Sequence, residues 1–186
     1  MAQERKVAVL VGSLRKASYN RLAALALAKL APAGMSLQIV EIRDLPLYDE
    51  DLETAAPPAA WTAFRDQVRP CDAVLFVTPE YNRSVPGGLK NALDVGSRPY
   101  GQSVWSRKPA AIMSVSPGAI GGFGANHHLR QSLVFLDMPV LQQPEAYVGG
   151  AATLFGPDGA LVNPATESFF RSFIEAFAAL IERATT

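Results

Sequence analysis

Three short, almost wholly apolar runs constrain the fold more than any other feature of this sequence. They cover residues 6–11, 72–78 and 110–115, and a loop follows each of them. A strand that is covered on both faces, as in a parallel sheet, is apolar throughout, whereas a half-exposed strand alternates apolar and polar residues. We therefore predict three buried parallel strands. Two weaker strand candidates lie at residues 36–42 and 140–148, the second interrupted by a proline.

Helical patterns separate these runs. Apolar residues recur at three- and four-residue spacing, most clearly near the carboxyl end of the chain. The expected helices are 18–31, 61–68, one that begins near Pro86, 122–135 and 169–182. Parallel strands need such crossover connections, so the alternation predicts an α/β protein with helices on both faces of the sheet. No linker or repeat divides the chain, and we expect a single domain over residues 1–186.

The loop after the first strand carries the residues of an anion site. In such sheets ligands bind beyond the carboxyl ends of the strands, at the switch point of the strand order. Ser13, Arg15, Ser18 and Asn20 lie here, beside the start of a helix whose free N–H groups favour a phosphate. The loop has neither the glycine pattern of dinucleotide-binding folds nor a Walker lysine, which favours a phosphate monoester. The alternative is that Ser18 only caps the helix and Arg15 is a solvated surface residue.

The loop after the second of these runs is stiff and reaches the same edge of the sheet. Pro79 and Pro86 restrict it, and Gly87 and Gly88 let a backbone approach a flat partner closely. We expect its main-chain groups to meet the polar edge of an aromatic ring system, with Tyr81 supplying a face. A plain turn and helix cap would not readily explain so rigid a stretch directly after a buried strand.

The loop after the third run is rich in glycine. Residues 115–124 hold four glycines and one proline. Two hypotheses are open for it: a backbone wall against a ligand, or a flexible connector. Its place at the end of a buried strand favours the wall.

Together these segments resemble a known family. Residues 12–20 resemble the phosphate-loop motif of the NADPH-dependent FMN reductases, and residues 79–94 resemble their flavin loop. Residues 121–136 are similar to the bacterial quinone and chromate reductase branch. The similarity covers about residues 7–149. It implies a flavodoxin-like three-layer α/β/α sandwich with strand order 2-1-3-4-5, bound FMN, and a homodimer or homotetramer.

The resemblance also implies roles for particular residues. The positions expected to bind FMN are Ser13, Arg15, Ser18, Tyr19, Asn20, Pro79, Glu80, Tyr81, Asn82, Ser116 and Gly118. Arg83 and Ser84 are expected near the substrate or NAD(P)H, and Arg130 and Glu145 match positions that join subunits. Arg83 and the pair Val95-Gly96 depart from the family pattern. Both departures are expected near the flavin mouth, which leaves acceptor choice and nicotinamide preference open.

The expected activity follows from the resemblance. NAD(P)H, either NADPH or NADH, would reduce FMN and leave before a second substrate enters, in a ping-pong cycle. Expected acceptors are quinones, azo compounds, metal oxyanions such as chromate, or free flavin. No catalytic side chain is expected, although Glu80 could donate a proton. Two alternatives stay open: a flavodoxin-like electron carrier, and a non-catalytic nucleotide-binding regulatory module. A carrier is usually strongly acidic, unlike this chain.

Composition narrows the partners. Lys+Arg and Asp+Glu are both 17, so nothing predicts nucleic-acid or anionic membrane binding. No signal peptide or membrane span is expected, and a cytoplasmic location is predicted. The lone Cys71 cannot form an intramolecular disulfide and is expected to be a packed thiol. We expect no metal site, because the adjacent His127 and His128 would point in different directions on a helix.

Overall fold

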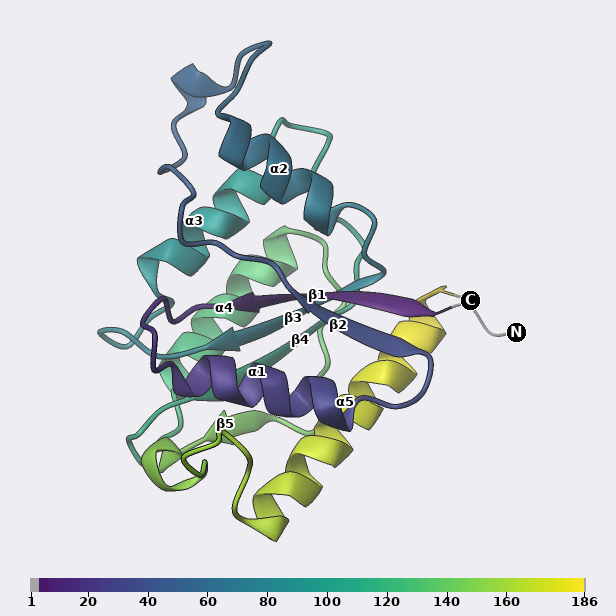
Figure 1. Cartoon of the computed structure of the whole chain (residues 1–186). Coiled ribbons are helices and arrows are strands. Elements are labelled where there is room, and N and C mark those ends of the chain that lie inside the picture. Colours follow the sequence, from purple (N-terminus) through teal and green to yellow (C-terminus); the bar gives the residue numbers. More distant parts are fainter. Residues whose placement is uncertain (1–3, 186) are drawn as a thin grey trace.

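The computed structural model describes residues 4–185, and five strands in it form one parallel sheet in the order β2-β1-β3-β4-β5 (Figure 1). The strands are β1 (Arg5–Val11), β2 (Met35–Ile39), β3 (Ala73–Thr78), β4 (Ala110–Val115) and β5 (Ala146–Val148). This order confirms the predicted flavodoxin-like α/β class.

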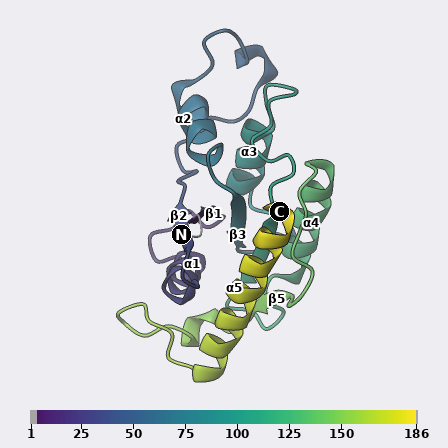
Figure 2. The same ribbon diagram turned by 90° about the vertical axis from the view of Figure 1, so that its right-hand side faces the viewer.

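Helices cover both faces of the sheet. The helices are α1 (Tyr19–Leu30), α2 (Ala59–Val68), α3 (Gly87–Gly96), α4 (Phe123–Phe135) and α5 (Pro164–Thr185), with short 3-10 turns η1 (Glu50–Leu52) and η2 (Ala151–Thr153). Figure 2 shows α2 and α3 on the side of the sheet opposite to α1 and α5. The part of the chain that the structure describes has no helix long and apolar enough to cross a membrane.

The two faces of each central strand belong to two different apolar clusters. In β1, Val7, Val9 and Val11 pack into the cluster that contains the apolar side chains of α1 and α5. The intervening Ala8 and Leu10 pack into the cluster under α2, α3 and α4. Side chains alternate between the faces of a strand, so a strand between two helical layers must be apolar at every position. This explains the uninterrupted runs in the sequence.

The structure differs from the sequence-based prediction at the edge strands. Ladder pairing in β2 ends at Ile39, three residues before the expected end, although Val40 still donates a backbone hydrogen bond to Val9 at 3.0 Å. At the other edge only three residues form β5, and Val140 makes an isolated bridge to Ala110. Proline cannot donate to a ladder, which fits the gap around Pro144. Strand length at an edge depends on one neighbour only, and the periodicity of the sequence does not report it.

The parallel arrangement brings three loops to one edge of the sheet. Val11 pairs with Val77 in the neighbouring strand β3, and Val77 pairs with Met113 in β4. The loops that follow β1, β3 and β4 therefore leave the sheet side by side. These are the three loops in which the sequence predicted the site.

Candidate active site

A cavity of about 480 Å³ lies among these three loops. Its wall is formed by Ser13, Arg15, Tyr19, Asn20, Pro79, Glu80, Tyr81, Val115, Ser116 and Pro117. All but two of these residues were predicted to belong to the site. The exceptions are Val115, at the end of β4, and Pro117.

The first loop leads directly into α1. Ser18 is the N-cap residue, and its hydroxyl accepts a hydrogen bond from the backbone N–H of Arg21 at 3.2 Å. The helix-capping role considered for Ser18 is therefore present. The guanidinium of Arg15 lies 4.7 Å from the centre of the Tyr19 ring, a cation–π contact at the wall of the cavity. Arg15 is exposed but has this partner, so it differs from the freely solvated residue of the alternative hypothesis.

Asn20 lines the cavity and has a buried acceptor atom without a partner. The residue is only 4% exposed, and its amide nitrogen donates to the backbone carbonyl of Val115 at 3.3 Å. Its amide oxygen, Oδ1, has no hydrogen-bond partner. Because a carbonyl oxygen can only accept, the bond to Val115 fixes which end of the amide is the nitrogen. Oδ1 is therefore suited to a ligand hydroxyl or N–H, and a buried acceptor without a partner favours binding of such a group.

The second loop forms a tight hairpin. Tyr81 and Ser84 exchange two backbone hydrogen bonds of 3.1 and 3.0 Å. The central residues Asn82 and Arg83 have positive φ angles of 51° and 64°, as in the two-residue turns that fit the twist of paired strands. Tyr81 reaches the cavity, whereas Asn82 and Arg83 lie at the turn and do not line it. The exposed Arg83 makes a 3.5 Å ion pair with Glu80.

Glu80 has a structural role that sequence reasoning missed. Its Oε2 accepts a hydrogen bond from the backbone N–H of Ala125 at 3.1 Å, in the first turn of α4. This helix lacks a side-chain cap of its own, because Gly122 is its N-cap residue. A carboxylate there satisfies a free N–H group and the positive end of the helix dipole. In the sequence, this distant cap is indicated only by Gly122, because Ser, Thr, Asp or Asn would be expected directly before a helix that begins at residue 123.

The glycines of the third loop serve packing against the protein itself. A Cβ atom on Gly121 would lie 2.5 Å from the carbonyl carbon of Tyr147, and one on Gly122 would lie 3.0 Å from the Cβ of Ser114. Both glycines have positive φ. The loop is therefore held closely against β4 and β5 and is not the flexible connector of the alternative hypothesis. Only Ser116 of the predicted pair lines the cavity, while the exposed Gly118 donates its N–H to the Ser116 hydroxyl at 3.1 Å.

Residues 5–153 match the NADPH-dependent FMN reductase family. The chain belongs to that family. It is therefore an oxidoreductase with FMN as its cofactor and NAD(P)H as its electron donor.

Relatives of this FMN reductase family member are similar over nearly their whole length. A quinone reductase of Pseudomonas putida is 66% identical over 182 residues, which cover 98% of this chain and 97% of the relative. A 2-hydroxy-1,4-benzoquinone reductase of a Burkholderia species is 46% identical, covering 95% and 96%. The solved structure of FerB, a flavoenzyme NAD(P)H:(acceptor) oxidoreductase of Paracoccus denitrificans, aligns with a TM-score of 0.91 at 41% identity, covering 97% of this chain and 98% of FerB.

The residues around the cavity suit FMN in this family member. A helix N-terminus with Ser13 and Arg15 offers donors to a phosphate, and the Asn20 acceptor is suited to a sugar hydroxyl. Tyr81, which is 48% exposed, offers an aromatic surface at the edge of the cavity. The residues present therefore match the phosphate, the polyol chain and the flat ring of the cofactor.

One family departure does not lie where the sequence analysis expected it. Val95 is fully buried in the cluster under α2, α3 and α4 and does not line the cavity. Its neighbour Gly96 makes room for Trp105, because a Cβ there would lie 2.3 Å from the indole ring. The expectation that this pair borders the flavin mouth is wrong. Val95 packs in the apolar cluster, and Gly96 packs against the Trp105 ring. Arg83 remains the departure closest to the site.

The remaining predicted residues lie outside the cavity. Ser84 faces a separate hollow of about 220 Å³ and shares a 2.9 Å hydrogen bond with His128 Nδ1. His127 instead contacts the Tyr147 hydroxyl at 2.9 Å. The two histidines thus have different partners, and within residues 4–185 no group of three or more potential ligands could hold a metal ion. The pKa of Tyr147 is raised, mainly by burial and to a smaller extent by a hydrogen bond to Glu145.

Of the predicted subunit contacts, Arg130 lies on α4 and Glu145 lies directly before β5. Arg130 is partly buried and donates to Asn126 Oδ1 at 3.1 Å and to the carbonyl of Leu141 at 3.0 Å. Glu145 is exposed. Cys71 is a buried thiol, as expected, and burial raises its pKa.

Proposed function

We propose that this chain is a quinone reductase that passes electrons from NAD(P)H through FMN to small quinones. The cavity at the carboxyl edge of the sheet, with the unpaired Asn20 oxygen in its wall, carries the proposal. The similarity to quinone reductases at 66% and 46% identity supports quinones as the acceptor class. Chromate, azo compounds and free flavin are further proposed acceptors, because an open cavity does not discriminate strongly among flat or small oxidants.

We propose that the chain holds the cofactor at three points. Ser13, Ser18 and Arg15 hold the phosphate at the start of α1, and Asn20 accepts from a hydroxyl of the polyol chain. In the second and third loops, Pro79, Glu80, Tyr81 and Ser116 line the cavity and border the ring, and Asn82 and Gly118 complete this border from positions outside the cavity wall. The bound FMN supplies the two-electron chemistry by exchanging electrons first with the nicotinamide and then with the acceptor.

The side chains around the cavity orient the loops and the acceptor, and the proposed reaction does not require them to transfer protons. Glu80 is held by the Ala125 N–H and by the ion pair with Arg83, so its carboxylate anchors the second loop to α4. Tyr81 is half exposed and can cover one face of a planar acceptor. We infer that the chain orients the acceptor mainly by shape and ring contacts, which suits quinones.

A visible spectrum tests this function. Protein reconstituted with FMN is expected to be yellow, and anaerobic NADPH should bleach it. Steady NADPH consumption with 1,4-benzoquinone then separates an enzyme from an electron carrier. Colourless protein after reconstitution would contradict FMN binding, and bleaching without turnover would favour the carrier.

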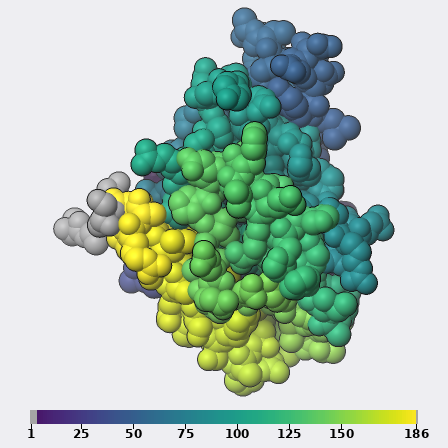
Figure 3. Space-filling view, turned by 180° about the vertical axis from the view of Figure 1, so that it is seen from behind, coloured from purple at the N-terminus to yellow at the C-terminus, as the bar shows by residue number. Residues whose placement is uncertain are grey.

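We also propose that the protein works as a homodimer or homotetramer through the face beside α4. Large apolar side chains are exposed there, and the carboxyl-terminal half of the chain forms most of this face in Figure 3. The exposed residues are Ile120, Phe123, Val134 and Phe135. Apolar patches of this kind often mark subunit contacts, and Arg130 and Glu145 lie next to them. Light scattering of the purified protein tests this proposal.

We also propose a cytoplasmic location, because the reaction consumes NAD(P)H. Cell fractionation tests it.

A further inference from the structure

A second cavity adjoins the first at the same edge of the sheet. It has a volume of about 400 Å³ and lies beyond the carboxyl ends of β1 and β2. Ser13 and Arg15 belong to the walls of both cavities, so the first loop separates them. Lys16, by contrast, lines only the second cavity.

Positive charge gathers around this second cavity. Four cations, Arg15, Lys16, Arg21 and Arg43, face two carboxylates, Glu41 and Asp44. The chain as a whole has equal numbers of basic and acidic residues, 17 of each, so this excess is local. A concave, positively lined surface concentrates anions.

Two of the cations are held in place by contacts between segments far apart in the chain. Arg21 on α1 forms an ion pair of 2.7 Å with Glu41, which follows β2. The Arg43 guanidinium donates to the backbone carbonyl of Leu14 in the first loop. The Glu41 carboxylate is thus paired with Arg21. Arg43 has further N–H groups for a ligand, because a guanidinium carries five N–H donors. The cavity therefore presents held donors beside the exposed ammonium group of Lys16.

We propose that this cavity binds the 2′-phosphate on the adenosine ribose of NADPH. The inference rests on the proposed function, which requires a nicotinamide dinucleotide close to FMN. NADPH differs from NADH by one phosphate group, and a cavity with more cations than carboxylates beside the flavin phosphate loop suits that group. Arg43 follows β2 in this chain, and guanidinium groups match phosphate oxygens in pairs. The first cavity, with the Asn20 acceptor, stays available to the flavin.

The site predicts that the enzyme distinguishes NADPH from NADH by charge. Lys16→Gln and Arg43→Gln are each expected to lower the ratio of kcat/KM for NADPH to that for NADH by about tenfold, the effect of losing one charged contact to phosphate. Lys29→Gln is the matched control, since Lys29 is an exposed cation on the last turn of α1 and lies outside the second cavity. It should leave the ratio unchanged.

Direct binding provides a readout besides turnover. Calorimetry should show that adenosine 2′,5′-bisphosphate binds more tightly than adenosine 5′-monophosphate, and that Lys16→Gln removes most of the difference. Equal affinity for the two nucleotides, or an unchanged cofactor ratio in Lys16→Gln, would overturn the proposal. If Arg43→Gln loses FMN because the Leu14 contact is broken, Lys16→Gln decides alone. Absence of quinone turnover in the parent protein would overturn the proposed function and leave the nucleotide measurement valid.

Discussion

Asn20 is a buried residue whose amide oxygen has no hydrogen-bond partner in the protein. A second buried asparagine, Asn126, provides the comparison, because its amide oxygen accepts from Arg130 at 3.1 Å and its amide nitrogen lies 3.4 Å from the carbonyl of Ala146. Asn20 has one such bond and one empty acceptor. Asn126 therefore stabilises the fold itself, whereas Asn20 gains its second partner only when a ligand donates to it.

We predict opposite effects for the two asparagines. Asn20→Ala should raise the Kd for FMN about tenfold, as expected for one lost hydrogen bond. It should change the free energy of unfolding of the FMN-free protein by no more than about 1 kcal/mol, because a bond and an unpaired acceptor are lost together. Asn126→Ala should lower that free energy by about 2–3 kcal/mol. Fluorescence titration and urea unfolding measure both, and unchanged FMN affinity in Asn20→Ala would contradict the assigned role.

Gly121 illustrates a residue whose absent side chain is required. Both Gly121 and Gly150 have positive φ, of 65° and 61°. A Cβ on Gly121 would meet the backbone of Tyr147, whereas a Cβ on Gly150 would meet nothing within 4 Å. Gly150→Ala should cost only the backbone strain of about 1 kcal/mol, and Gly121→Ala at least about 2 kcal/mol more because a clash is added. Similar unfolding midpoints in urea for the two variants would show that the third loop can shift freely.

At the scale of elements, the second loop and α4 depend on each other. The Glu80 carboxylate caps the first turn of α4, and the Ser84–His128 hydrogen bond makes a second link one helical turn further on. The loop that carries Tyr81 is thus held by a helix that follows a different strand. This coupling gives the wall of the cavity a fixed place without any contribution from a ligand.

Replacement of Glu80 tests that coupling. Glu80→Ala should lower the free energy of unfolding by about 1–2 kcal/mol and speed amide hydrogen exchange at Ala125, because the helix loses its cap. Glu167→Ala, which removes an acidic residue from the first turn of α5 and its exposed pair with Arg171, should change stability by no more than about 0.5 kcal/mol. Equal effects of the two substitutions would mean that Glu80 acts only as a surface charge.

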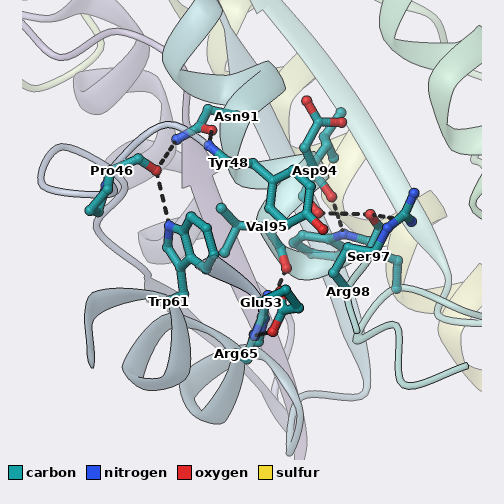
Figure 4. A network of polar contacts seen from close by, with 12 residues as sticks. Pro46, Tyr48, Glu53, Trp61, Arg65, Asn91, Asp94, Val95, Ser97 and Arg98 are labelled. Carbon is teal, nitrogen blue, oxygen red and sulfur yellow. Dashed lines mark hydrogen bonds and ion pairs between the residues drawn. The ribbon is translucent and has the colours of Figure 1, made fainter. Parts of the chain in front are cut away.

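At the scale of the whole molecule, a buried ion pair joins the long segment after β2 to the helical layer. Arg65 on α2 donates to both carboxylate oxygens of Glu53, at 2.9 and 2.6 Å, and to the carbonyl of Val95 at 2.9 Å (Figure 4). In the same layer the indole N–H of Trp61 donates to the backbone carbonyl of Pro46 at 3.0 Å. The segment of residues 44–58 is therefore held against α2 at two points.

The pair predicts a non-additive effect on stability. Glu53→Gln leaves the Arg65 charge buried without its counter-charge and should lower the free energy of unfolding by about 3 kcal/mol. Glu53→Leu combined with Arg65→Met should cost clearly less, because no buried charge remains. Guanidinium unfolding of the FMN-free protein measures both. A double variant less stable than Glu53→Gln would show that the pair contributes more than the charge balance.

By itself the sequence determined the chemistry of the layers and the place of the site. Consecutive apolar residues required strands covered on both faces, and polar loops after such strands had to meet at one edge. The strand order and the cofactor came from the resemblance of residues 12–20 and 79–94 to a family. These features depend on local pattern or on long motifs, and both can be read along the chain.

Only the tertiary structure decided which atoms meet. Glu80 and Ala125 are 45 positions apart, and Asn20 and Val115 are 95 apart. Periodicity reports which face a residue occupies but carries no information about its partner across such distances. The cap of α4, the empty acceptor of Asn20, the packing of Gly96 against Trp105 and the second, basic cavity all arise from contacts of this kind.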